Sequence, residues 1–392
     1  MTMFTELIAA VLLTAPPGDL PGSEASFPSE GPVYWVYVGA ESEDYLHRIR
    51  FSGGSAEVYE TIPVADLYVQ SNVPDRLTES EAPHGVAVDP RGGRVYMTTG
   101  HGVPDGKLWQ VEAGTGKLLA DPLDLGRFPA SLGLSPDGRL AFVVNFNLHG
   151  EMAPSSVSVI STTEMTEVAR IETCTMPHGS RVESTGRFHY SVCMMDDQLV
   201  EIDARRLQVS RRFHLGTGEE GPLDVNDLGP HAHEGHDHLG HGMMYEATCS
   251  PTWVQASPQG DRTYVACNAS DQVLEISVED WEVVRRFETG RGPYNLDVTG
   301  DGRLLIVTLK QGDGVEFIDL ETGESAARLD TSTRVVHGVA LSPDDRYAFV
   351  SVEGIGGEPG KVDVFDLESL ERVSSVEVGL QASGIAFWKM EE

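Results

Sequence analysis

The sequence predicts an all-β fold, a seven-bladed β-propeller of four-stranded blades, with one blade closed by strands from both ends of the chain. Three observations lead to this prediction. A short motif recurs six times, the interval between its copies matches one propeller blade, and the two ends of the chain hold complementary parts of a seventh copy.

Each copy of the motif predicts a pair of antiparallel strands. An alternating segment precedes a turn of Pro, Asp and Gly, then Arg and a second apolar segment, as in SPDGRLAFVVN. Asp and Gly supply the backbone angles that hairpin turns require. Two more strands follow, as in QVLEISVEDWEVVRRFETG. The copies start at Pro83, Pro129, Pro177, Pro251, Pro293 and Val336.

The spacing of these starting residues fits one blade per copy. Successive starts are 46, 48, 74, 42 and 43 residues apart. The long interval holds an insertion, residues 219–248, and without these 30 residues it shortens to 44. Because a four-stranded blade takes about 40–45 residues, each interval corresponds to one blade.

The two ends of the chain predict a composite seventh blade. The segments VYWVYVGAESEDYLHRIRF and AEVYETIPV contain three strands and lack a first one, whereas the C-terminal QASGIAFWKM contains only a first strand. Joining them closes the ring and removes open sheet edges. We therefore expect residues 32–392 to form a single propeller.

Residues 1–31 are predicted to be a leader and a linker. Residues 7–15 form a short apolar run that ends in a small residue before two prolines, as in a secretory signal, although Glu6 precedes the run and no Lys or Arg does. The linker that follows is rich in Pro, Gly, Ser and Glu. We expect a periplasmic or secreted protein, with a cytoplasmic protein as the alternative. No stretch approaches the roughly 18 apolar residues of a membrane span.

The charge of the chain excludes some partners. Asp and Glu number 61 against 28 Lys and Arg, for a formal net charge of −33. Nucleic acids and anionic membrane surfaces are bound by clustered basic residues, so neither is expected as a partner. The acidity itself is expected to favour solubility.

Three copies of the motif resemble a known family. SPDGRLAFVVN, SPQGDRTYVACN and SPDDRYAFVSV are similar to the repeats of YVTN-repeat (YncE-like) propellers, and the resemblance covers nearly the whole chain after residue 32. It implies a propeller fold and an exported binding protein or enzyme. It does not imply one activity, because propellers host many unrelated functions.

Histidines recur at one position of the repeat. The residue after each starting residue is His in three blades, and each of these histidines precedes a glycine. The first strand of a blade lines the channel, so equivalent positions converge on the axis. Three converging imidazoles predict a metal site, whereas capping of its own strand is the alternative for each histidine. The position holds His84, Ala130, His178, Thr252, Tyr294 and His337, with Ala382 assigned to it in the composite blade, and His101 and His149 lie in loops on the same face.

The four cysteines also follow the repeat. Cys193 and Cys267 each lie 16 residues after a starting residue, and Cys174 and Cys249 shortly precede the same two starts. One cysteine therefore enters the first strand of each blade and one leaves the second strand. We expect Cys174–Cys193 and Cys249–Cys267 disulfides, with thiolate metal ligands or free buried thiols as alternatives.

The insertion contains a histidine-rich string, GPHAHEGHDHLGHGMM. Closely spaced imidazoles bind zinc, copper or nickel with modest selectivity. The insertion connects the last strand of one blade to the first strand of the next, on the same face as the His-Gly positions. We therefore expect it to form a mobile loop that covers the channel mouth. No HExxH or CxxC motif occurs, so a protease zinc helix and a zinc ribbon are excluded. The histidines of the string are His231, His233, His236, His238 and His241.

Two functions follow from this constellation. The first is capture and delivery of a transition metal, copper first and zinc second, with an acceptor protein as a candidate partner. This resembles the architecture of periplasmic zinc metallochaperones. The second is a copper-dependent oxidoreductase acting on a small molecule, with a thiol as the candidate substrate. Short Pro-His-Gly pieces resemble the copper methanethiol oxidase (selenium-binding protein) family. A non-catalytic scaffold, or a lactonase-like hydrolase, which would need a carboxylate-rich calcium site, ranks third.

Overall fold

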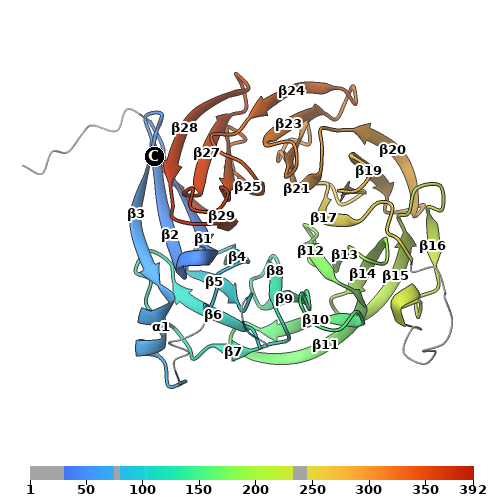
Figure 1. The fold of residues 1–392 in the computed structure, drawn as a ribbon, viewed down its shortest axis with the longest axis horizontal. Coiled ribbons are helices and arrows are strands. Elements are labelled where there is room, and N and C mark those ends of the chain that lie inside the picture. Colours follow the sequence, from blue (N-terminus) through green and yellow to red (C-terminus); the bar gives the residue numbers. More distant parts are fainter. Residues whose placement is uncertain (1–30, 75–79, 102, 104, 233–244) are drawn as a thin grey trace, which may run out of the picture.

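The chain forms seven β-sheets arranged as blades around a central axis (Figure 1). The computed structural model describes residues 31–74, 80–101, 103, 105–232 and 245–392. Within each sheet, consecutive strands pair antiparallel from the inner strand outward. The predicted seven-bladed β-propeller is therefore confirmed.

The composite blade joins the two ends of the described chain. β29 (Ala382–Glu391) is the inner strand and pairs with β1 (Val33–Ala40), which is followed by β2 (Tyr45–Ser52) and β3 (Ser55–Pro63). Ala40 pairs with Ala382 at one end and Val33 with Glu391 at the other. The blue and red strands of Figure 1 thus share one sheet, which closes the ring as the sequence predicts.

The next three blades follow in chain order. Their inner strands are short and their second strands are buried along nearly their whole length. The first contains β4 (Val86–Val88), β5 (Arg94–Thr99), β6 (Lys107–Glu112) and β7 (Leu123–Asp124). The second contains β8 (Pro129–Leu134), β9 (Leu140–Asn145), β10 (Pro154–Ser161) and β11 (Thr166–Thr175). The third contains β12 (Pro177–Val182), β13 (Phe188–Cys193), β14 (Gln198–Asp203), β15 (Gln208–His214) and β16 (Gly221–Leu223).

The last three full blades are the most regular. One contains β17 (Pro251–Ala256), β18 (Arg262–Cys267), β19 (Gln272–Ser277) and β20 (Glu282–Glu288). The next contains β21 (Pro293–Val298), β22 (Leu304–Leu309), β23 (Gly314–Asp319) and β24 (Ser325–Asp330). The last contains β25 (Val336–Leu341), β26 (Tyr347–Val352), β27 (Lys361–Asp366) and β28 (Glu371–Glu377).

Two elements depart from the repeat. The insertion, predicted to be a loop, contributes the short strand β16, which pairs with β15 as a fifth strand. The helix α1 (Val64–Gln70) links the composite blade to the next one. Its Tyr68 ring packs edge-on against Trp109, with the ring centroids 4.8 Å apart, which buries one face of the helix.

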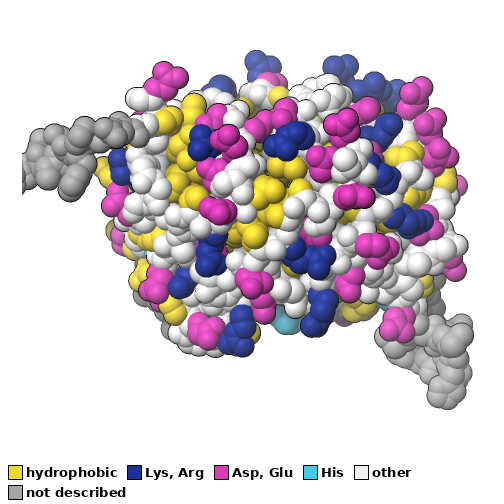
Figure 2. Space-filling view, turned by 90° about the horizontal axis from the view of Figure 1, so that it is seen from above, with side chains coloured by type: hydrophobic (Ala, Val, Ile, Leu, Met, Phe, Trp, Pro, Cys, Tyr) yellow, Lys and Arg dark blue, Asp and Glu magenta, His cyan; other side chains and the backbone are white. Residues whose placement is uncertain are grey.

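The core lies between neighbouring blades. Second strands are buried on both faces because adjacent sheets cover them, as in β22, whose six residues are all buried. Outer strands alternate between exposed and partly buried residues, as β3 and β24 do. Figure 2 shows acidic and basic side chains mixed over one side of the ring, without a continuous basic surface. No helix among the described residues is long and apolar enough to cross a membrane.

A left-handed residue precedes every inner strand and defines the start of each repeat. All seven have φ between 44° and 66°, and only one is a glycine. Gln381 is the member in the composite blade, so Ala382 is its starting residue and Ser383 takes the position of the histidines. Our assignment of Ala382 to that position is therefore wrong by one residue. The seven are Ala82, Phe128, Met176, Ser250, Gly292, Val335 and Gln381.

Candidate functional site: a histidine-floored funnel

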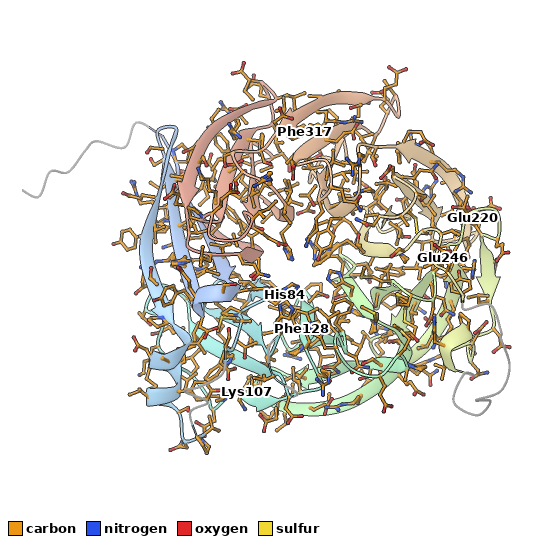
Figure 3. All side chains as sticks on the ribbon, in the orientation of Figure 1. His84, Lys107, Phe128, Glu220, Glu246 and Phe317 are labelled. Carbon is orange, nitrogen blue, oxygen red and sulfur yellow. A yellow bond between two sulfur atoms is a disulfide. The ribbon has the colours of Figure 1, made fainter. Side chains whose placement is uncertain are left out.

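Three sets of equivalent residues meet at one end of the channel. The first set precedes the inner strands, the second is the position of the histidines, and the third directly follows each second strand. Together they line a funnel of about 490 Å³. Figure 3 shows His84 and Phe128 close to the centre of the ring. The third set contributes Glu41, Phe146, Met194, Asn268, Lys310 and Glu353 to the lining.

The structure brings the three predicted channel histidines together. The ring centroids of His84 and His337 are 5.0 Å apart, and those of His84 and His178 are 6.2 Å apart. All three side chains are buried. Tyr294 lies between His178 and His337, with its ring centroid 5.4 Å and 5.1 Å from theirs. These four rings all come from the same repeat position, and they form the bottom of the funnel, which we call its floor.

Hydrogen bonds fix the orientation of two of these imidazoles. His178 Nδ1 lies 2.9 Å from the carbonyl oxygen of Thr252 and donates to it, because a carbonyl can only accept. His178 Nε2 is therefore the basic nitrogen, and it accepts a hydrogen bond of 3.1 Å from the Tyr294 hydroxyl. His84 Nδ1 contacts a carboxylate oxygen of Glu41. The Nδ1 atom of each ring is thereby engaged, and Nε2 is the nitrogen that remains as a potential metal ligand, although in His178 it accepts the Tyr294 hydrogen bond.

His337 differs from the other two. Neither of its ring nitrogens makes a hydrogen bond of normal geometry, although its side chain is almost fully buried and the backbone of Ser383 lies near the ring. Burial lowers the pKa of His337 well below its usual value, and burial likewise lowers the pKa of His178 to about 3. Both imidazoles are therefore neutral at neutral pH, which is the form that binds metal ions.

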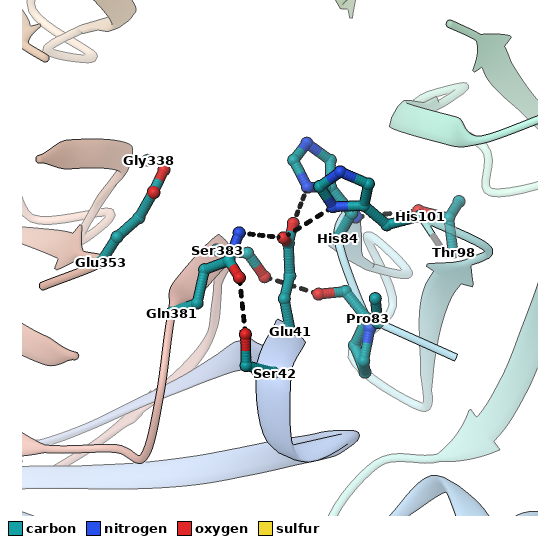
Figure 4. A network of polar contacts seen from close by, with 12 residues as sticks. Glu41, Ser42, Pro83, His84, Thr98, His101, Gly338, Glu353, Gln381 and Ser383 are labelled. Carbon is teal, nitrogen blue, oxygen red and sulfur yellow. Dashed lines mark hydrogen bonds and ion pairs between the residues drawn. The ribbon is translucent and has the colours of Figure 1, made fainter. Parts of the chain in front are cut away.

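Glu41 is the centre of the polar network at the funnel wall (Figure 4). Its carboxylate contacts His84, accepts from His101 at 3.1 Å and accepts from the Gln381 amide at 2.6 Å. Burial by itself would raise the pKa of Glu41, but the interactions with His84 and His101 outweigh it and lower the pKa to about 2. The hydrogen bond to Glu41 raises the pKa of His101, although burial opposes this.

Lys310 and Glu353 form a partly buried ion pair, from the two blades that precede the composite blade. The Lys310 ammonium lies 2.7 Å from the Glu353 carboxylate and 4.2 Å from the centroid of the Tyr294 ring. Burial would lower the pKa of Lys310, but Tyr294 and Glu353 outweigh it and raise the pKa. Sequence reasoning missed Glu41, Lys310 and Glu353. Each directly follows a second strand, so the repeat spacing that located the histidines also contained this signal.

The remaining wall is apolar and aromatic. The His101 ring stacks on Phe128, with the centroids 4.3 Å apart and the planes within 10°, and on His149, at 6.0 Å and 14°. His101 and His149 therefore lie at the rim of the funnel. Phe146, Leu148, Met176 and Met194 complete the apolar lining.

Below the imidazoles the channel narrows to a cavity of about 30 Å³. His84, Arg181, Trp253, Asn295 and His337 are among the residues that line it. Trp253 Nε1, Asn295 Oδ1 and both ring nitrogens of His337 are buried without a hydrogen-bond partner. A cavity of this size holds about one water molecule or one ion.

The four cysteines form two disulfides, Cys174–Cys193 and Cys249–Cys267, with Cα atoms 6.0 Å and 4.4 Å apart. Each disulfide joins the segment that enters an inner strand to the end of the neighbouring second strand. These cysteines are therefore not available as thiolate ligands in this structure.

The histidine-rich string is only partly described. His231 is buried, and its Nδ1 lies 2.6 Å from a carboxylate oxygen of Asp196, in the turn after β13. Figure 1 shows the described flanks of the string near β15 and β16, toward the outside of the ring, and Figure 3 places Glu246 away from His84. His231 is thus separate from the funnel. His233, His236, His238 and His241 lie outside the described residues.

No group of three or more His, Cys, Asp or Glu in the described part of the chain is arranged to hold a metal ion as it stands. Two imidazoles on one tetrahedral zinc have ring centroids about 5 Å apart, given Zn–N distances of about 2.0–2.1 Å. The His84–His337 pair meets this distance, whereas the His84–His178 pair is wider. The Tyr294 hydroxyl also occupies His178 Nε2.

Comparisons with known proteins identify the fold alone. No protein-family model and no curated protein sequence matches the chain. Among solved structures, hydrazine synthase from Kuenenia stuttgartiensis is similar at a TM-score of 0.59 and 18% identity, over 81% of this chain and 91% of that one. The β-propeller domain of Cps50 (Swd1) from Myceliophteria thermophila is similar at a TM-score of 0.57 and 13% identity, over 78% and 91%. Since both identities are low, the chain is shown to be a β-propeller, and its activity has to be inferred from its own residues.

Proposed function

We propose that the protein binds a transition metal ion, copper first and zinc second, at the floor of the funnel for capture and delivery. The observation that carries the proposal is the pair of buried, unpartnered ring nitrogens of His337 beside a cavity that it shares with His84. Leaving a buried polar group without a partner costs about 1–3 kcal/mol, so such a group calls for a water molecule or an ion as its partner.

The ligand set fits this role. Glu41 orients His84, and the Thr252 carbonyl orients His178, in the way that outer hydrogen bonds orient metal-binding imidazoles. Three imidazoles on one ion would leave an open position for water or a further ligand. Binding requires that the Tyr294 hydroxyl leave His178 Nε2. Copper ranks above zinc because the thioethers of Met176 and Met194 line the same funnel.

One observation favours a second function, a copper-dependent oxidoreductase acting on a small molecule such as a thiol. A metal carrier needs no chamber above its ion, yet the funnel encloses about 490 Å³ with an apolar wall. In that case the ion would supply an open coordination position for oxygen or substrate. The residues of this chain would hold the ion through the imidazoles and enclose the substrate against Phe128 and Phe146.

We further propose that the protein belongs with the exported YVTN-repeat propellers. The two disulfides support a periplasmic or secreted location, because such bonds persist in oxidising compartments. An acceptor protein for the metal is part of the same proposal.

Metal analysis tests the proposal. The purified protein is loaded with copper or zinc and desalted, and bound metal is measured by mass spectrometry. The triple variant His84→Ala, His178→Ala, His337→Ala should lose the tightly bound ion. His189→Phe is the matched control, because His189 is equally buried but lies outside the funnel. If the triple variant keeps full metal stoichiometry while deletion of residues 229–242 abolishes it, the funnel is not the site.

The same preparations separate the two functions. Rapid transfer of the ion to an acceptor without a change in its oxidation state supports delivery. An electron-spin signal from bound copper, together with oxygen uptake in the presence of a thiol, supports the oxidoreductase.

A further inference from the structure

A second cavity of about 380 Å³ adjoins the funnel. It shares Glu41, His101 and Gln381 with the funnel and adds Arg127 and His149. The two cavities therefore meet along the network centred on Glu41, and a molecule in the second cavity would lie next to the mouth of the funnel.

Arg127 has no partner for its charge among the described residues. Its guanidinium makes no hydrogen bond or ion pair with the residues that the structure describes, although it lines this cavity. Several other arginines that line or approach the sheets are paired, as Arg285 is with Glu275 at 2.7 Å and Arg328 with Glu316 at 2.9 Å, whereas exposed ones such as Arg205 are not. In a chain with 61 acidic and 28 basic residues, an uncommitted guanidinium beside a cavity points to an anion as its partner.

The acidic residue in the cavity wall does not oppose an anion. Glu41 is the only carboxylate among the described residues that line it. Its oxygens are committed to His84, His101 and Gln381, and its side chain is 3% exposed.

The shape of the wall selects a flat molecule. Phe128, His101 and His149 form a continuous stack in which neighbouring planes lie within 10° and 14°. Flat rings pack offset on such a stack, whereas a small tetrahedral anion gains nothing from it. The stack and the guanidinium line one connected space, so charge and shape act on the same molecule.

We propose that this cavity binds a small planar organic carboxylate. Its carboxylate pairs with the Arg127 guanidinium, and its flat part lies against the His101–His149 end of the stack. Arg–carboxylate pairs of this kind form two parallel hydrogen bonds. The site is independent of the metal proposal, because none of its features needs an ion at the imidazoles.

Isothermal titration of the full chain, treated with a chelator, tests the proposal with three probes: benzoate, its neutral analogue benzamide, and acetate. Benzoate should bind at least tenfold more tightly than benzamide and than acetate. Arg127→Gln should remove the preference for benzoate over benzamide. Arg205→Gln is the matched control, because Arg205 is exposed and also makes no ion pair with described residues, and it should bind as the unaltered protein does.

Two results would overturn the proposal. Equal binding of benzoate and benzamide, or an unchanged preference in Arg127→Gln, would show that the guanidinium does not receive the carboxylate. Equal binding of acetate and benzoate would show that the stack plays no part. Because the titration uses metal-free protein, loss of the metal site in the experiment above leaves this result unaffected, and the reverse also holds.

Discussion

Replacing His189 with phenylalanine should stabilise the protein and flatten its response to acid. His189 lies in β13, fully buried, with its ring stacked on Phe142 at 4.8 Å and 12°. Neither ring nitrogen has a hydrogen-bond partner. A phenyl ring of similar size keeps the stacking and removes two unsatisfied polar atoms, so we expect a gain of about 1–3 kcal/mol in the free energy of unfolding at pH 7.5.

The pH dependence of the free energy of unfolding gives a more specific prediction. Burial lowers the pKa of His189 from 6.5 to about 3. Between these values the unfolded chain binds a proton that the folded chain does not, so acid favours unfolding and stability falls as the pH drops from 6.5 toward 3. One pKa unit corresponds to about 1.4 kcal/mol, and stability falls over the roughly two units between pH 6.5 and pH 4.5. This histidine alone should therefore lower the free energy of unfolding by roughly 3 kcal/mol between pH 7.5 and pH 4.5.

Urea unfolding of both proteins at pH 7.5 and pH 4.5 measures this difference. The loss of stability between the two pH values should be smaller in His189→Phe by roughly 3 kcal/mol. The reasoning would be refuted by a variant that is less stable at pH 7.5, or by equal acid sensitivity of the two proteins.

Four further predictions concern the funnel and its supports. Glu41→Gln should weaken metal binding about 10–100-fold, because the orienting carboxylate of His84 is lost, and a competition titration with a chelator would show it. Tyr294→Phe should strengthen binding about 2–10-fold in the same titration, since it frees His178 Nε2 from a hydrogen bond worth about 0.5–1.5 kcal/mol; weaker binding would instead make the hydroxyl a ligand. Bound metal should persist as the pH falls below 6.5 and be released toward pH 3, because the pKa of His178 is about 3, and release centred near pH 6.5 would place the ion on other histidines. The double change Cys174→Ser, Cys193→Ser should lower the free energy of unfolding by about 2–5 kcal/mol in urea titrations, and no loss would mean that the disulfide is dispensable.

The spacing of the repeat predicted the fold and the three channel histidines, but not the groups that surround them. It placed His84, His178 and His337 at one level because the inner strands of a propeller are equivalent by rotation. It failed where an element is not repeated, as with β16 and α1, which no other blade contains. The composite blade was misaligned by one residue because Gln381, unlike most of its equivalents, does not precede a proline.

The sequence by itself determined the seven blades, the closure of the ring and the convergence of three imidazoles. These follow from local strand patterns and from the period of the repeat. Only the tertiary structure decided which groups hold those imidazoles. Glu41 and Gln381 are 340 residues apart, and His178 and Tyr294 are 116 residues apart, yet each pair shares a hydrogen bond. The pKa values, the environment of the His337 ring and the lack of a described partner for Arg127 depend on such contacts between blades, which no periodicity within one blade records.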